Sequence, residues 1–187
     1  MRDSVRLIER EIPVTEKHPA KSRKGIYRLS DNFFRFWFRF VLPYKSRLVE
    51  GGERKVMEEE ILPHLDNFIG QVFDTICVEI LRYLVDEEKI ELSYDRAGRW
   101  WNGNEEIDLV AVAGDKPVFA AECKWSKKPV GIDILKDLCR KASLILSDET
   151  SDNLRLGLFS RSGFTKEIEA LGRKDEIELI DVRKTGP

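Results

Sequence analysis

Two patterns of apolar and polar positions divide the chain into an N-terminal hairpin with one helix and a larger unit of mixed elements. Residues 4–14 and 25–29 place charged residues between apolar ones and flank a polar, basic loop, which is typical of a β-hairpin. Asp31 can cap a helix over residues 32–42, which Pro43 ends. That helix is apolar on nearly every side, so we expect it to pack between two surfaces.

The rest of the chain alternates between helical spacing and apolar strands. Residues 66–86 carry apolar side chains at intervals of three and four, which predicts a helix. The later segments read as three strands, an amphipathic helix, a strand, a short helix and a final strand, which predicts an α/β unit. Their expected ranges are 89–101, 105–113, 117–125, 132–145, 154–160, 165–172 and 177–182.

A glycine- and charge-rich stretch at residues 45–57 is typical of a linker and suggests how the chain is divided. We expect residues 1–45 to form the hairpin with its aromatic helix. Residues 46–65 then form the linker, and residues 66–187 form the α/β domain.

The composition is that of an ordinary water-soluble globular protein. Of the 187 residues, 42% are hydrophobic and 35% are charged, and the net charge of −2 does not by itself indicate nucleic-acid binding. Basic residues gather in four blocks, each of which taken singly is typical of a solvated face: residues 17–24, 96–99, 124–128 and 136–141. No apolar run is long enough to cross a bilayer, and the N-terminus lacks the pattern of a signal peptide, so we expect a cytoplasmic protein with no membrane contact.

Cysteine and histidine give no sign of a metal-thiolate or histidine site. The three cysteines are an odd number without a short paired spacing, which argues against a disulfide scaffold or a zinc knuckle and fits a reducing compartment. The two histidines, His18 and His64, lie far apart in the sequence, and neither has a neighbour with metal-ligand spacing.

The candidate chemistry lies in charged residues placed inside two apolar strands. Asp108 opens one of these strands, and Glu122 and Lys124 close the next. Because strand residues alternate between faces, Glu122 and Lys124 point the same way and Cys123 points the other way. Two carboxylates, with the backbone carbonyl of Cys123 nearby, could bind Mg²⁺ or Mn²⁺. Lys124 could orient or deprotonate a water, or stabilise charge on a phosphate, so the set suits phosphodiester hydrolysis.

Each of these residues also has an ordinary structural explanation. A lone Glu-x-Lys at a strand end is usually a surface salt bridge, and an isolated Asp in a strand is common. Asp74, in the first helix of the α/β domain, could add a metal ligand or could face solvent. The coincidence of an acid in one strand with Glu-x-Lys in its neighbour, between helices in a suitable order, favours the site.

That combination resembles a known superfamily. The string EID at residues 106–108, a short hairpin and the string ECKW at residues 122–125 are similar to the PD-(D/E)xK nucleases, whose archaeal members include Holliday-junction resolvases. The strings YRLSDNFFRFWFRFVLP, GRWWNGNEEIDLVAV and AECKW resemble the C-terminal region of archaeal winged-helix ATPases, a domain with a nuclease-like core. The resemblance implies a restriction-endonuclease-like αβββαβ core with a mixed central sheet, preceded by a partial winged-helix hairpin and the aromatic helix.

The resemblance also assigns roles to individual residues. Asp108 and Glu122 match the metal-binding acids of the superfamily, and Lys124 matches its catalytic lysine. Asp74 matches a helix position where relatives often carry Glu, and its shorter side chain reaches less far. Ile107 stands where the name-giving proline would be.

The sequence departs from the archaeal winged-helix ATPases in two ways, and these differences determine which partners we expect. The chain has no G-x-x-x-x-G-K-[ST] phosphate loop, so we expect it to act with an ATPase domain or subunit rather than to be one. Only three residues precede Ser4, so the helices of a winged-helix unit are missing. We therefore expect the C-terminal piece of a larger ATPase or the product of a split gene. Without those helices, we expect the hairpin and the aromatic helix to pack against a second copy of the chain and so to form a homodimer.

Two functions remain open at this stage. One is a Mg²⁺- or Mn²⁺-dependent nuclease domain that acts on DNA, including branched DNA, through Asp108, Glu122 and Lys124. The alternative is a catalytically inactive module with the same fold that binds DNA or a partner and regulates an ATPase through the aromatic helix.

Overall fold

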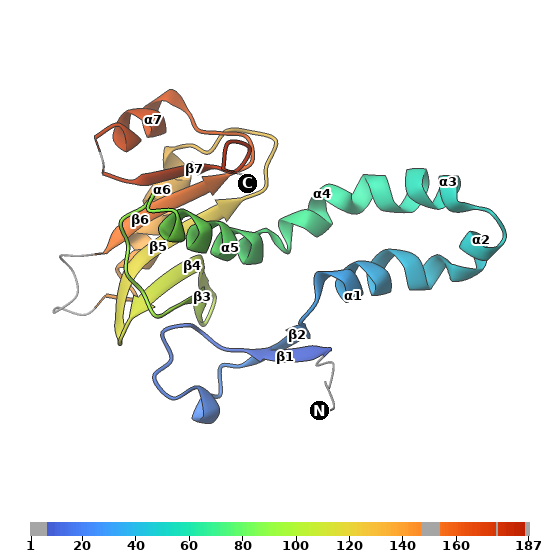
Figure 1. The fold of residues 1–187 in the computed structure, drawn as a ribbon, viewed down its shortest axis with the longest axis horizontal. Helices are drawn as coiled ribbons and strands as arrows, with labels where there is room; N and C mark the ends of the chain where they lie inside the picture. The colour runs from blue at the N-terminus through green and yellow to red at the C-terminus, as the bar shows by residue number, and fades with distance from the viewer. Residues whose placement is uncertain (1–6, 147–153, 175, 186–187) are drawn as a thin grey trace. The chain divides into compact units, whose positions relative to one another are not determined.

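The structure, a computed structural model, describes residues 7–146, 154–174 and 176–185 (Figure 1). The chain forms two compact units, which we call the N-terminal unit and the sheet unit. The N-terminal unit joins the residues up to Glu11 with Gly25–Val72. The sheet unit joins Ile12–Lys24 with the chain from Phe73 onward.

The N-terminal unit contains the predicted hairpin in a shorter form. Strands β1 (Ile8–Glu11) and β2 (Ile26–Leu29) pair antiparallel. The Arg28 guanidinium donates to the Glu9 carboxylate across the pair at 2.8 Å. Residues 4–6, expected to begin the first strand, lie outside the described residues. The strand expected to run on to residue 14 stops at Glu11 instead, shortly before Pro13, because proline cannot donate to the ladder.

The aromatic helix begins where the sequence predicts. Asp31 caps α1 (Asn32–Phe36), its carboxylate accepting from the Phe33 N–H at 2.7 Å. The helix continues through a π-helical turn, η2 (Trp37–Val41), and a short 3₁₀ turn, η3 (Leu42–Tyr44). Phe40 is buried within the unit, whereas Phe33, Trp37 and Phe38 are exposed, which differs from the expectation of a helix packed between two surfaces.

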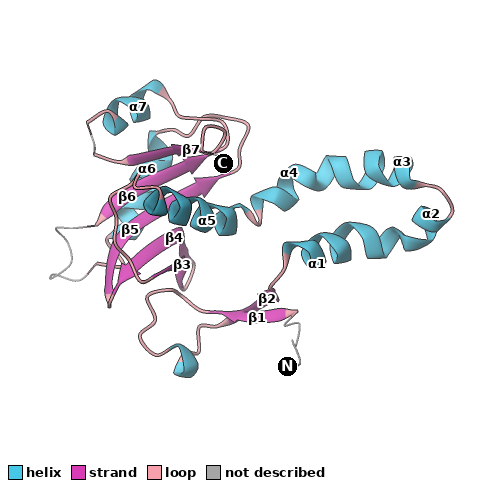
Figure 2. Cartoon of the chain, in the orientation of Figure 1, coloured by secondary structure: helices cyan, strands magenta, loops and turns pink. Residues whose placement is uncertain are grey.

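Residues 46–65, expected to be a linker, are mostly helical. Gly51, at φ +81°, makes the turn between two antiparallel helical arms (Figure 2). Val56 and Ile61 of the second arm are buried together with Phe40 of the first, and Phe68 packs against this cluster, so a hydrophobic core holds the arms together. The elements of this stretch are α2 (Lys45–Val49), α3 (Glu53–Val56), the π-helical turn η4 (Met57–Ile61) and α4 (Leu62–Gly70).

The sheet unit contains the predicted αβββαβ order in a five-stranded mixed sheet of order β3-β4-β5-β6-β7. The first three strands are antiparallel, whereas β5, β6 and β7 run parallel. The first strand, expected from residue 89, begins only at Arg96. The strands are β3 (Arg96–Asn102), β4 (Glu105–Ala113), β5 (Lys116–Lys124), β6 (Arg155–Ser160) and β7 (Glu178–Asp181).

Helices cover both faces of this sheet. The predicted helix at 66–86 is broken, and its second part, α5 (Phe73–Asp86), packs on one face (Figure 1). Helix α6 (Ile132–Ala142) and the short α7 (Lys166–Gly172) contribute to the core on the other face. Alternate strand residues fill the two cores, and Gly157 leaves room for the Phe119 ring, which a Cβ at that position would strike. Within the described residues, no helix is long and apolar enough to cross a membrane.

Candidate active site where the β4–β5 ladder ends

The candidate site forms at a point where two neighbouring strands stop pairing. The antiparallel register of β4 and β5 runs from Ala113 opposite Lys116 to Leu109 opposite Ala121 and goes no further, although both strands continue. At the next position the Asp108 side chain replaces the missing backbone acceptor: its Oδ2 accepts from the Cys123 backbone N–H at 2.8 Å. This hydrogen bond satisfies the N–H and fixes the carboxylate against β5.

Glu122 and Lys124 project from β5 toward the same place, as their spacing in the strand predicts. The Lys124 Nζ donates to Asp108 Oδ2 at 3.0 Å and also to Glu122 Oε2. The structure therefore brings together the three side chains that the sequence singled out. The two carboxylates face one point, which the Lys124 ammonium occupies.

A fourth charged residue of the cluster was missed from the sequence. Lys141 of α6 lies across from β5, and its Nζ donates to Glu122 Oε1 at 2.9 Å and forms an ion pair with Asp137 at 2.8 Å. It belongs to a basic block that resembles a solvated helix face. Its position in the helical pattern could have revealed it. Lys141 lies three residues after Leu138 and next to Ala142, both of which are buried, so it falls near the side of the helix that faces the sheet.

Burial and neighbouring charges shift the pKa values of Glu122 and Asp108 in opposite directions. Glu122 is 2% exposed, and its pKa is raised by burial and by the neighbouring charge of Asp108. Burial also favours the neutral form of Asp108, but the charge of Lys124 and the Cys123 N–H outweigh it and lower the Asp108 pKa. Burial opposes the charge of Lys124, yet the two carboxylates raise its pKa above the ordinary value. Divergent acidities of this kind are common in catalytic sites.

Asp74, the fourth predicted site residue, is engaged elsewhere. Its Oδ2 lies 3.1 Å from Nε of Arg99, which also pairs with Glu106 at 3.0 Å. Arg99 lies in a β-bulge of β3, between Gly98 and Trp100, and bulges commonly redirect a side chain. Among the described contacts of Asp74, none reaches Asp108 or Glu122.

The donor set suits a hard cation rather than zinc. Within the described residues, no group of three or more His, Cys, Asp or Glu side chains could hold a metal ion. Asp108 and Glu122 provide two converging carboxylates. The Cys123 backbone carbonyl, expected from the sequence as a third ligand, stays a prediction. Mg²⁺ commonly binds through one or two carboxylates and several waters, so this pair meets its needs. The ammonium between the carboxylates shows that the position accepts positive charge.

The Cys123 side chain itself has no part in this chemistry. It points to the opposite face of β5, toward the core under α5, together with Cys77. Both thiols are free, and burial raises the pKa of the Cys123 thiol well above its ordinary value. A neutral thiol in an apolar core is neither a nucleophile nor a metal ligand.

A basic rim adjoins the site where β5 and β6 end. The Arg161 N–H donates to the Lys124 carbonyl at 3.2 Å, and its guanidinium lies over the Trp125 ring, 4.3 Å from the centroid. The Ser162 hydroxyl donates to the Ser126 carbonyl at 2.6 Å and ties the two loops together. Trp125 also packs on Phe73, which agrees with a packing role. Exposed lysines of the rim are Lys127, Lys128 and Lys166.

Comparison with known proteins identifies the family and leaves its activity open. The chain is 37% identical over 149 residues to an uncharacterized protein of Methanocaldococcus jannaschii, a match that covers 78% of this chain and 33% of the relative. The chain thus spans about a third of the length of that relative. No solved structure matches it. Residues 37–138 match the model of DUF234, described as "Archaea bacterial proteins of unknown function". That match covers more than half of the chain, which therefore belongs to the DUF234 family.

Proposed function

We propose that the sheet unit is a PD-(D/E)xK nuclease-like domain that hydrolyses phosphodiester bonds of DNA with the help of Mg²⁺ or Mn²⁺. The observation that carries this proposal is the convergence of Asp108, Glu122 and Lys124 on one point in an αβββαβ fold. These are the residue types that the reaction needs: two acids for a hard cation and one fixed positive charge for a phosphate.

The roles of the residues follow from their positions. Asp108 and Glu122 would hold the divalent cation together with the Cys123 backbone carbonyl. A cation bound there would polarise the phosphate and acidify a water molecule. The pKa of Lys124 is raised, so its side chain is an ammonium at neutral pH. As an ammonium it would orient the water and stabilise negative charge on the phosphate.

The rim supports DNA as the substrate. Lys127, Lys128 and Lys166 are exposed beside the strand ends that carry the site, and Arg161 extends the basic surface. Lysine and arginine side chains bind the phosphates of DNA without regard to sequence. A net charge of −2 for the whole chain is compatible with such a local surface.

A cleavage assay tests the proposal. Purified protein is incubated with branched, single-stranded and duplex DNA in the presence of Mg²⁺ or Mn²⁺ and, separately, of chelator. We expect metal-dependent cleavage that disappears in Glu122→Gln and Lys124→Met variants which keep the wild-type circular dichroism spectrum. Cleavage that persists unchanged in both variants would come from a contaminant and would refute the proposal, as would the absence of cleavage on all three substrates.

A second candidate is a catalytically inactive regulatory module of the same fold. It is favoured by the outer face of the aromatic helix, where Phe33, Trp37 and Phe38 are exposed and Phe33 stacks on Trp37 at 6.1 Å. Exposed aromatics in such a row are typical of a docking surface. Stable association with an ATPase domain or subunit, together with no binding of Mn²⁺ by calorimetry, would favour this candidate over the nuclease.

A further inference from the structure

Lys141 is a buried charge that the proposed reaction leaves without a role. Its side chain is 13% exposed, although a lysine on a surface helix is ordinarily in water. The Nζ lies 2.9 Å from Glu122 Oε1 and 2.8 Å from Asp137 Oδ2. Burying an ammonium is costly unless it is paired, so this contact with Glu122 calls for an explanation.

The two oxygens of Glu122 face different cations. Oε2 is directed to Lys124 of the same strand, whereas Oε1 is directed to Lys141 of the helix on that face of the sheet. A glutamate side chain has three rotatable bonds, so its place in β5 does not fix the plane of its carboxylate. Donors on both oxygens fix that plane and turn Oε2 toward Asp108.

Helix α6 is anchored well enough to act as the support. Leu138 is fully buried in the core on this face of the sheet, and Ala142 is nearly fully buried. Figure 1 shows α6 beside the sheet. Arg140 donates two hydrogen bonds, of 2.8 and 2.7 Å, to Glu105 at the start of β4. Asp137 in turn holds the Lys141 ammonium from one turn earlier in the helix. The position of Nζ relative to Glu122 is therefore set by the fold.

We propose that Lys141 is a positioning residue: it holds Oε1 of Glu122 so that Oε2 is presented to the divalent cation. This inference rests on the proposed function, because it concerns the same site. Hydrogen-bond partners of metal ligands typically change metal affinity or activity by about 10–100-fold when they are removed.

Positioning and simple electrostatics predict opposite signs. A lysine that acted only through its charge would repel the cation, so a neutral residue in its place would tighten cation binding. A lysine that orients Glu122 is needed for binding, so the same replacement would weaken it. The sign of the change in Mn²⁺ affinity thus separates the two roles.

The test measures the dissociation constant of Mn²⁺ by the electron paramagnetic resonance signal of the free ion, and kcat and KM for DNA cleavage. The variants are Lys141→Met and Lys141→Gln. The matched control is Lys136→Met, which removes the same charge from an exposed position of α6. We expect weaker Mn²⁺ binding and lower kcat by about 10–100-fold in Lys141→Met, with KM for DNA unchanged. The effect should be smaller in Lys141→Gln, which keeps a donor, and absent in the control.

Unchanged or tighter Mn²⁺ binding in the folded Lys141 variants would overturn the inference and leave the nuclease proposal standing. If Lys141→Met does not fold, Lys141→Gln decides by the same sign. A wild-type protein that neither binds Mn²⁺ nor cleaves DNA would instead refute the proposed function, and the inference would fall with it.

Discussion

Asp108 and Cys123 are joined by a hydrogen bond in which a side-chain carboxylate takes the place of a backbone carbonyl. The Cys123 N–H donates to Asp108 Oδ2 at 2.8 Å, just beyond the last paired residues, Leu109 of β4 and Ala121 of β5. Because the ladder ends here, the Asp108 carboxylate can bond to the backbone of β5, and it then lies beside Lys124. The site therefore forms at the point where the pairing of β4 and β5 ends.

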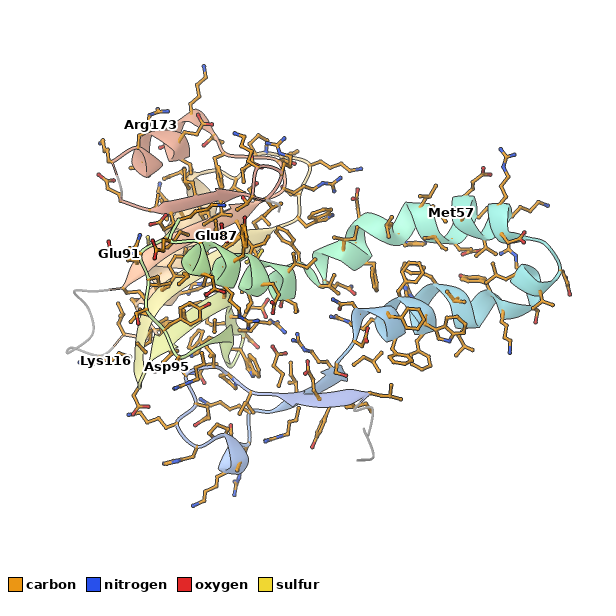
Figure 3. The ribbon with its side chains drawn as sticks, in the orientation of Figure 1. Met57, Glu87, Glu91, Asp95, Lys116 and Arg173 are labelled. Carbon is orange, nitrogen blue, oxygen red and sulfur yellow. The ribbon has the colours of Figure 1, made fainter. Side chains whose placement is uncertain are left out.

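Removing the charge of Asp108 should abolish activity and leave the fold intact. Asp108→Asn retains an oxygen that can accept from the Cys123 N–H but no longer binds a hard cation well, so we expect cleavage to fall by a factor of about 100 or more. The matched control is Asp95→Asn. Asp95 also accepts a backbone N–H, from Gly114 at 2.5 Å, and lies near the β4–β5 turn (Figure 3).

In a fixed-time cleavage assay, the Asp95→Asn protein should match the wild type. Equal loss of activity in both variants would mean that the effect comes from stability rather than from the site.

The basic rim should govern DNA affinity through its charge. Lys128→Glu should weaken binding to duplex DNA. It should also reduce the slope of log K against log salt concentration by an amount that corresponds to about one phosphate contact or more. Lys116→Glu changes the charge equally but at the other end of β5, where Lys116 is labelled in Figure 3. Fluorescence anisotropy at several salt concentrations measures both. A larger effect of Lys116→Glu would place the DNA elsewhere.

Asp181 should make the stability of the sheet unit depend on pH. Its carboxylate accepts from the Arg183 guanidinium at 2.9 and 2.7 Å and from the Arg183 backbone N–H, and these contacts lower its pKa. A folded-state pKa below the unfolded one stabilises the protein above the unfolded value, near 3.9, and this stabilisation disappears as the pH falls through the folded pKa.

Asp181→Asn should therefore cost about 1 kcal/mol at pH 7 and close to nothing once the pH has fallen below the folded pKa. Thermal unfolding of both proteins across this range gives the difference. A difference in Tm that does not shrink at low pH would show that the carboxylate charge is not what stabilises the end of β7.

Helix α6 should owe its position to Leu138. This side chain is fully buried against the sheet, so Leu138→Ala should lower the free energy of unfolding by about 2–5 kcal/mol. Leu144→Ala, at an exposed position just beyond the helix, should change it by less than about 0.5 kcal/mol. Urea denaturation followed by circular dichroism measures both. Similar values for the two variants would contradict the packing of α6 described above.

The sequence was sufficient to predict the elements of the sheet unit because strand alternation and helical spacing are local properties. It was also sufficient for Glu122 and Lys124, whose common face follows from a spacing of two. It did not predict the helices of residues 46–65. Glycine and charge there resemble a linker, but Val56 and Ile61 belong to a core completed by Phe40, from an arm earlier in the chain. A contact of that kind has no local signature.

Two further features of the site also depend on tertiary contacts. Asp74 pairs with Arg99, which lies in the β-bulge of β3, and a bulge changes the register without a clear mark in the sequence. Lys141 stands in a basic block whose burial depends on how α6 lies on the sheet. Both residues are defined by tertiary contacts rather than by their neighbours in sequence.

The most direct test of the account is a crystal structure of the protein soaked in Mn²⁺, with anomalous diffraction data collected to locate the ion. We expect an anomalous peak from an ion bound by the carboxylates of Asp108 and Glu122, with the Lys124 ammonium moved away from the point between them. A crystal at a saturating Mn²⁺ concentration that shows no peak there, with Lys124 still joining the two carboxylates, would contradict it.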